Sequence, residues 1–276
     1  MRRLFIACLL ASFTLCASAE TLRVVSSIKP VQLLVTAIGG EAVDSQLLLP
    51  AGFSPHDARL KPSQWQMINK AELLIWVGPA LERFLESALA GNDKALMLQT
   101  GAGQDLSDPH IWMNVARVAQ MSVALSERLS SLRPQHKALF EGNAARLRAA
   151  LQMQHGELLQ ALALKKLVYL LPHRGYSHFE RQYGLAPAAV LSLNDEQMPG
   201  TAHIVELRSR LLAGEFGCVF REPQQSSRLI SRLLSGVDVR VIPLDPMGAS
   251  VANDRQGFEQ YYRALGEAFV ACQQPG

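Results

Sequence analysis

Short hydrophobic runs alternate with longer amphipathic stretches along most of this chain. The short runs are rich in β-branched residues or leucine, whereas the longer stretches repeat their apolar residues at helical spacing. Eight runs are candidate strands, four in each half of the chain: 22–26, 46–49, 73–77, 95–98, 167–171, 188–191, 218–220 and 239–242. Alternation of this kind is typical of βα units, so we expect an α/β protein with a parallel sheet in each half.

A long helical stretch separates the two sets of strands. Residues 115–164 carry apolar positions at helical spacing, and only Pro134 interrupts them. We therefore predict two consecutive helices, one ending before Pro134 and one running from about Pro134 to Leu164. A helix of some 30 residues spans roughly 45 Å, which is enough to bridge two lobes. The predicted organisation is a first lobe at 20–133, a linking helix at 134–165 and a second lobe at 166–276.

The first residues have the pattern of an export signal. Two arginines at positions 2 and 3 precede the apolar run 4–15, and small residues follow at 17–19. We interpret residues 1–19 as a cleaved secretory signal peptide, so we expect the mature protein to be exported. No later stretch reaches the roughly 18 uncharged apolar residues of a membrane-spanning helix, so we expect a soluble product.

Charge and cysteine content refine this picture. Removal of the first 19 of 276 residues leaves 257, and the formal charge falls from +3 to +1. A nearly neutral chain argues against nucleic acid or an anionic membrane as the main partner, because both are bound through clustered positive charge. The mature part keeps two cysteines, Cys218 and Cys272. In an oxidising compartment they most simply form one disulfide, and two buried thiols are the alternative.

Four short segments each place a potential metal ligand beside proline or glycine. The ligand candidates are His56, His110, His173 and Asp245. Three imidazoles and one carboxylate are a set typical of a borderline-soft cation such as zinc. The candidates lie dozens of residues apart, so only a folded tertiary site could gather them.

These candidates fall where an α/β architecture places ligand sites. Ligands of open α/β sheets bind beyond the carboxyl ends of the strands. His56 follows the strand expected at 46–49, His173 follows 167–171, and Asp245 follows 239–242, while His110 lies in a loop after 95–98. Each lobe would thus supply two ligands, and the metal would lie in the cleft between the lobes.

Five sequence motifs then resemble a known family. They are Ser-Pro-His-Asp-Ala-Arg-Leu-Lys-Pro-Ser at 54–63, Asp-Pro-His-Ile-Trp-Met-Asn at 108–114, His-Arg-Gly-Tyr-Ser-His-Phe-Glu-Arg-Gln-Tyr-Gly-Leu at 173–185, Cys-Val-Phe-Arg-Glu-Pro-Gln at 218–224 and Leu-Asp-Pro-Met-Gly at 244–248. In order and spacing they resemble the periplasmic metal-binding proteins of ABC importers, and most closely the high-affinity zinc-uptake members. The resemblance runs from about residue 22 to residue 272.

This resemblance implies two α/β lobes joined by one long, rigid helix, with Zn²⁺ bound between them as the transported ligand. It also implies delivery to an inner-membrane ABC permease driven by its ATPase, and we expect a monomer. By motif, His56, His110 and His173 match the zinc-binding histidines, and a histidine at the third position favours zinc. Asp245 matches an acidic position that ligates metal in many members, so the fourth ligand is Asp245 or water.

Further residues take expected roles from the same motifs. Glu222 matches a position near the cleft, where an outer carboxylate could orient a histidine or balance charge, although an ordinary acid at a strand end is the alternative. We expect His178 to pack or hydrogen-bond beside the metal ligands, and Trp112 to fix the loop that carries His110. The paired cysteines of zinc-type members match Cys218 and Cys272, which supports the disulfide.

One departure from the family pattern concerns the first lobe. Many zinc-type members carry a mobile loop rich in histidine and acidic residues there, whereas residues 91–108 of this chain contain no histidine. A secondary importer component, or a separate periplasmic zinc chaperone as a partner, would account for the difference.

Three other functions remain open at this stage. A manganese or iron importer component would differ only in its cation. A secreted zinc hydrolase would also use three histidines and an open fourth position, but it would need a general base and a substrate pocket, and no His-Glu-x-x-His motif is present. A weaker alternative is an adhesin or structural role. We therefore expect a binding protein and not an enzyme.

Overall fold

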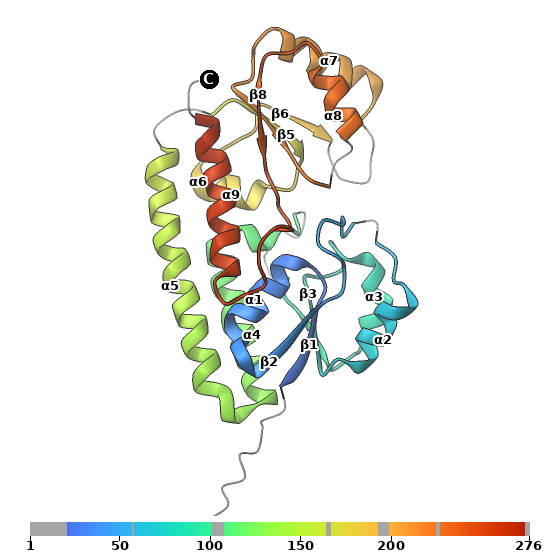
Figure 1. Cartoon of the computed structure of the whole chain (residues 1–276), viewed down its shortest axis with the longest axis vertical. Coiled ribbons are helices and arrows are strands. Elements are labelled where there is room, and N and C mark those ends of the chain that lie inside the picture. Colours follow the sequence, from blue (N-terminus) through green and yellow to red (C-terminus); the bar gives the residue numbers. More distant parts are fainter. Residues whose placement is uncertain are drawn as a thin grey trace, which may run out of the picture.

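The computed structural model describes residues 21–56, 58–100, 108–163, 167–192, 199–224 and 227–273. It has two lobes, each built on a four-stranded parallel sheet, as the alternating pattern predicts (Figure 1). The expected signal peptide at 1–19 lies outside the described residues. No helix in the described ranges is both long enough and apolar enough to cross a membrane.

The first sheet has the strand order β2-β1-β3-β4. Its strands are β1 (Leu22–Ser26), β2 (Val43–Leu47), β3 (Leu73–Trp76) and β4 (Ala95–Met97). Helix α1 (Lys29–Gly39) connects β1 to β2, whereas α2 (Pro62–Lys70) and α3 (Arg83–Leu89) flank β3. Neighbouring residues of β1 point to opposite faces, so Val24 packs into the large core while Val25 packs with the residues of α2 and α3.

The second sheet repeats this order as β6-β5-β7-β8. Its strands are β5 (Tyr169–His173), β6 (Ala189–Ser192), β7 (Cys218–Arg221) and β8 (Arg240–Pro243). Helices α6 (Ser177–Tyr183), α7 (Thr201–Leu212) and α8 (Ser227–Leu234) connect consecutive strands. A hydrophobic cluster that includes Leu170, Leu207 and Ile230 joins one face of this sheet to α7 and α8.

A helical layer runs along both lobes. Helix α4 (Val115–Leu132) is followed by a 3₁₀ turn at Pro134–His136 and by α5 (Lys137–Leu162). The final helix, α9 (Gly257–Gln273), lies beside α5 and contacts α1 as well, so the lobes are joined twice (Figure 1). One continuous hydrophobic cluster contains Leu22 of the first sheet, Leu147 of α5 and Phe269 of α9. The two lobes therefore share a core.

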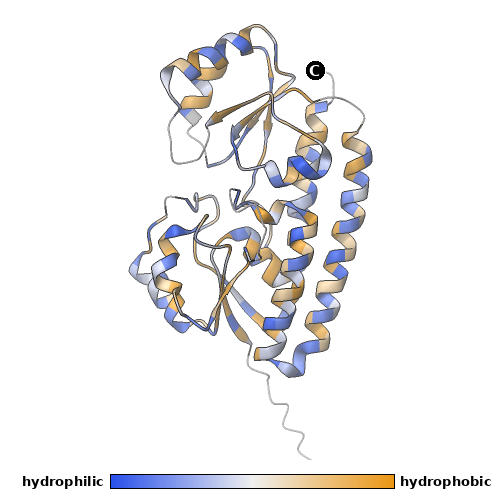
Figure 2. Cartoon of the chain, turned by 180° about the vertical axis from the view of Figure 1, so that it is seen from behind, coloured by the Kyte–Doolittle hydropathy of each residue, from blue (hydrophilic) through white to orange (hydrophobic). Residues whose placement is uncertain are grey.

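The hydropathy of α5 fits its place along the side of both lobes. In Figure 2 the strands of the second sheet are largely hydrophobic, while α5 alternates hydrophobic and hydrophilic segments along its length. Its buried positions include Phe140, Leu147 and Leu151, which recur at helical spacing, whereas Met153 on the outside is 68% exposed. One face of α5 thus packs on the molecule and the other faces solvent.

Three differences from the expected boundaries are larger than a single residue or change the place of a candidate ligand. The second strand is Val43–Leu47 instead of 46–49. Its pairing with β1 begins at Val43, which lies opposite Leu22. The start of the long linking helix also shifts, since Pro134 begins a 3₁₀ turn and the α-helix begins at Lys137. In the second sheet, β5 ends at His173 itself, so this candidate ligand lies on a strand and not in the loop after it.

Candidate metal site

Three of the four predicted ligands lie together where the lobes meet. His56 lies in the loop after β2, His110 lies in the loop before the 3₁₀ turn at Ile111–Met113, and His173 ends β5. The ring centroid of His110 is 5.4 Å from that of His56 and 5.4 Å from that of His173. His110 is therefore the central imidazole, with one histidine from its own lobe and one from the other.

A buried carboxylate orients the central histidine. Asp108 Oδ1 lies 2.7 Å from His110 Nδ1 and also accepts the backbone N–H of His110 at 3.0 Å. Burial acts to raise the pKa of Asp108, but the hydrogen bond and charge of His110, with the hydroxyl of Ser177, outweigh it and hold that pKa well below its ordinary value. An ionised carboxylate only accepts hydrogen bonds, so it takes a proton at Nδ1 and, in the neutral ring, leaves the lone pair on Nε2.

The second lobe repeats this arrangement at His173. Glu222 Oε1 lies 2.9 Å from His173 Nδ1, and the same oxygen accepts the Tyr176 hydroxyl at 2.6 Å. All three side chains are buried. Carboxylates that hold the Nδ1 side of a histidine in this way are the usual partners of metal-binding imidazoles. Glu222 thus contacts one of the candidate ligands, which fits the orienting role considered for its motif position.

Gly175 provides the space for the His173 ring. A Cβ added at Gly175 would lie 2.0 Å from His173 Nε2 and under 3 Å from both neighbouring ring carbons. Gly175 is not among the described glycines with positive φ, so any residue could adopt its backbone conformation. The glycine is required here because the imidazole occupies the place of a side chain.

Replacing Gly175 with alanine should therefore turn the His173 ring away from its position. We expect Gly175→Ala to weaken zinc binding by roughly 10- to 100-fold, the range for changes that misplace a ligating histidine. Competition with a chromophoric chelator measures the effect. Gly142→Ala is the matched control, because Gly142 lies in α5 with no atom within 4 Å of an added Cβ. Equal affinity of the two variants would contradict the assigned role.

Asp245 lies in the turn after β8, and its carboxylate has protein partners. Asp245 Oδ1 accepts the backbone N–H of Met247 at 3.0 Å and the amide of Gln224 at 3.2 Å, and Oδ2 accepts the N–H of Ala249 at 2.6 Å. These bonds occupy three of the roughly four lone-pair positions of a carboxylate. The fourth ligand, Asp245 or water, remains a prediction.

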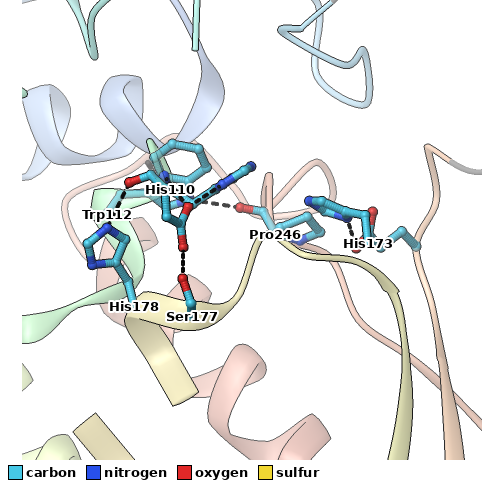
Figure 3. A network of polar contacts seen from close by, with 8 residues as sticks. His110, Trp112, His173, Ser177, His178 and Pro246 are labelled. Carbon is cyan, nitrogen blue, oxygen red and sulfur yellow. Dashed lines mark hydrogen bonds and ion pairs between the residues drawn. The ribbon is translucent and has the colours of Figure 1, made fainter. Parts of the chain in front are cut away.

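Trp112 connects the loop of His110 to the turn of Asp245. It is 1% exposed and donates its indole N–H to the carbonyl of Pro246 at 2.9 Å. Its ring centroid lies 5.2 Å from that of His110. Trp112 thus fixes the loop of His110 against the Asp245 turn, which is the structural role that its place in the sequence motif suggested (Figure 3).

His178 contacts the same loop from α6. Its Nε2 donates to the backbone carbonyl of Asp108 at 2.9 Å. Burial lowers the pKa of His178, which favours the neutral ring. In this arrangement His178 supports the residue that orients His110.

The donor atoms are not yet gathered in one coordination shell. Within the ranges that the structure describes, no three His, Cys, Asp or Glu side chains form a ready-made metal site. The ligand assignment therefore rests on the spacing of the three rings and on the carboxylates behind them.

Several site residues were absent from the sequence-based set. Asp108, Tyr176, Ser177 and Gly175 all contact a candidate ligand or its partner. Each lies within four residues of a candidate histidine in the printed sequence. That proximity was the available signal, but the partner of each side chain depends on how the loops fold.

Comparison with known proteins confirms the family resemblance of the sequence motifs. Residues 24–272 match the family model described as zinc-uptake complex component A, periplasmic, or ZnuA. The high-affinity zinc uptake system protein ZnuA of Yersinia pestis is 30% identical over 90% of each chain. A crystal structure of ZnuA has a TM-score of 0.78 at 22% identity and covers 92% of this chain and 100% of its own. The solute-binding protein FpvC of Pseudomonas aeruginosa, solved with Mn²⁺, has a TM-score of 0.76 at 18% identity, with 92% and 98% coverage.

Proposed function

Since this chain belongs to the ZnuA family of periplasmic zinc-uptake components, we propose that it captures Zn²⁺ between its lobes through His56, His110 and His173. The chain is a ZnuA-type zinc-binding component of a zinc-uptake system. The observation that carries the proposed site is the row of three imidazoles across the lobe junction, spaced 5.4 Å from ring to ring. The Nε2 atoms of the three rings would hold one zinc ion, and Asp245 or water would complete the shell.

The donor set favours zinc over manganese or iron. The fold alone does not decide the cation, because FpvC shares it and was solved with Mn²⁺. Imidazole nitrogen suits zinc, whereas carboxylate and carbonyl oxygens suit manganese. In this chain the carboxylates of Asp108 and Glu222 lie behind the imidazoles, at Nδ1, and not in the row itself. They make the rings stronger donors and offset part of the ion's charge.

The family also indicates the transport partners. ZnuA proteins work with an ABC permease and its ATPase, and they are periplasmic solute-binding proteins. We propose that this chain is exported through a cleaved signal at 1–19 and acts as a monomer. A periplasmic zinc chaperone as a further partner would fit the absence of histidine from residues 91–108.

A cation titration tests the proposed function. The purified mature chain, stripped with chelator, should bind one zinc ion tightly and manganese weakly in calorimetry. Free zinc at about a thousand times Kd should raise Tm by roughly 10 °C, because only the folded protein gathers the ligands. Affinity should fall as pH drops through about 6.5, where free imidazoles take up protons.

Two outcomes would contradict this proposal. Tighter binding of manganese than of zinc would move the chain to the manganese or iron alternative. Zinc-dependent turnover of ester or peptide substrates would favour a hydrolase, although the family is one of transporter binding proteins.

A further inference from the structure

Loop 108–115 and helix α6 form a continuous hydrogen-bonded junction between the lobes. Ser177 donates its hydroxyl to Asp108 Oδ2, and His178 donates to the backbone carbonyl of Asp108 at 2.9 Å. Further along α6, Gln182 donates to the carbonyl of Met113 at 2.8 Å and accepts the N–H of Val115 at 3.1 Å. The loop that carries His110 is thus attached to α6 at both ends.

Asp108 is the centre of this junction, because each of its three acceptor oxygens has a different partner. Oδ1 bonds the His110 ring within the first lobe, while Oδ2 and the backbone oxygen bond Ser177 and His178 of the second lobe. The residue is only 6% exposed, so water does not readily replace these donors. Figure 3 shows His110, Ser177 and His178 close to one another, as their bonds to this one residue require.

Helix α6 is also closely tied to the other candidate ligand. It begins at Ser177, four positions after His173, and Tyr176 between them bonds the carboxylate that holds His173. A displacement of α6 would therefore move His173 at the end of β5, or move Asp108 and with it His110. The distance between the two imidazoles depends on the same short helix.

We propose that Asp108 and Ser177 form a latch that sets the spacing of His110 and His173 across the lobe junction, so that zinc retention depends on the contact between the lobes. The inference rests on the proposed zinc-binding function. Asp108 and Ser177 are positioning residues, since neither touches the ion. When the latch is closed, His110 is held toward His173; when it opens, His110 loses its orientation and zinc is released faster.

The latch predicts a specific behaviour of Ser177 variants. Ser177→Ala removes the donor to Asp108 Oδ2 and should release zinc about tenfold faster, at the low end of the range for residues that support a metal ligand. Ser177→Thr keeps a hydroxyl and should restore the wild-type release rate. Ser131→Ala is the matched control, because its exposed hydroxyl donates to the carbonyl of Arg128 within α4, away from the site. Stopped-flow transfer of zinc to a chelating dye gives the rates.

Cobalt substitution separates positioning from general loosening of the fold. The visible absorption of bound Co²⁺ reports ligand geometry, so Ser177→Ala should change the spectrum whereas Ser131→Ala should not. Asp108→Asn provides a second variant if Ser177→Ala does not fold, and it should weaken zinc binding by roughly 10- to 100-fold.

The outcomes distinguish the latch from the proposed function. If the wild-type chain binds no zinc, the proposed function fails before the latch is tested by any variant, and the latch falls with it. If the wild-type chain binds zinc but Ser177→Ala or, failing that, Asp108→Asn matches the control in release rate and Co²⁺ spectrum, only the latch is wrong. A folded Ser177→Thr variant that releases zinc as fast as Ser177→Ala also overturns the latch.

Discussion

Replacing His173 with alanine is expected to weaken zinc binding by roughly 10²- to 10³-fold. Structural zinc sites with four ligands have apparent binding free energies of about 10–16 kcal/mol, so one ligand contributes about 2.5–4 kcal/mol, and 1.4 kcal/mol corresponds to a factor of ten. His173 is 3% exposed and is oriented by Glu222, so a water molecule cannot readily take its place. Calorimetry or chelator competition on the stripped protein measures the loss, and His56→Ala should behave alike.

His203→Ala is the control for this prediction. His203 lies on α7, where its Nε2 donates to the carbonyl of Val190 at 2.9 Å, so it has its own structural bond within the second lobe. His203→Ala removes the same kind of side chain as His173→Ala. The zinc affinity of this variant should stay within about twofold of the wild-type value. Equal losses for His203, His56 and His173 would mean that the variants act through stability, and the site assignment would be wrong.

The fold could largely be predicted from the sequence because burial and periodicity agree. The buried strands β1, β3, β5 and β7 are short hydrophobic runs, and each lies near its expected position. The pattern was least informative at the edge of the first sheet. Strand β2 contains Asp44 and Gln46 and has no fully buried residue, so its pairing with β1 is carried by the backbone and leaves no hydrophobic signal.

The second connection between the lobes could not be predicted from the sequence. The spacing of Phe258, Leu265 and Phe269 fits a helix, but nothing in that pattern says that α9 returns along α5. Contacts between residues far apart in sequence place it there, including an ion pair of Arg146 with Glu259. Because two helices and a shared core join the lobes, we expect only a modest closure of the lobes on zinc binding.

In the candidate site, too, some features could be predicted from the sequence and others depend on tertiary contacts. Its histidines were identified because their residue type and motif carry the chemistry, and the disulfide between Cys218 and Cys272 is confirmed. Glu222 was predicted to orient a histidine, whereas Asp108 and Tyr176 were missed, because they are ordinary residues until the loops fold. A sequence motif thus specifies the donors, whereas the tertiary structure specifies their direction.

Removing the disulfide is expected to be the largest single change in stability. Cys218 begins β7 and Cys272 lies near the end of α9, 54 positions later. Closing a loop of that length lowers the entropy of the unfolded chain by an amount worth about 4 kcal/mol at 25 °C. A Cys218→Ala/Cys272→Ala variant should therefore lose about that much unfolding free energy, and its Tm should fall by roughly 10 °C. Denaturant and thermal unfolding of the zinc-stripped chain measure both quantities.

The zinc affinity should change far less than the stability, because other contacts keep the end of α9 in place. Arg240 of β8 donates to the carbonyls of Ala271 and Cys272, each at 2.9 Å, and Phe269 is fully buried against Phe220. The native packing near the disulfide thus persists without it, and the change acts mainly on the unfolded state. Reducing agent should reproduce the loss of stability in the wild-type chain and leave the double variant unchanged. A large loss of zinc affinity at unchanged Tm would instead mean that the disulfide positions the metal site.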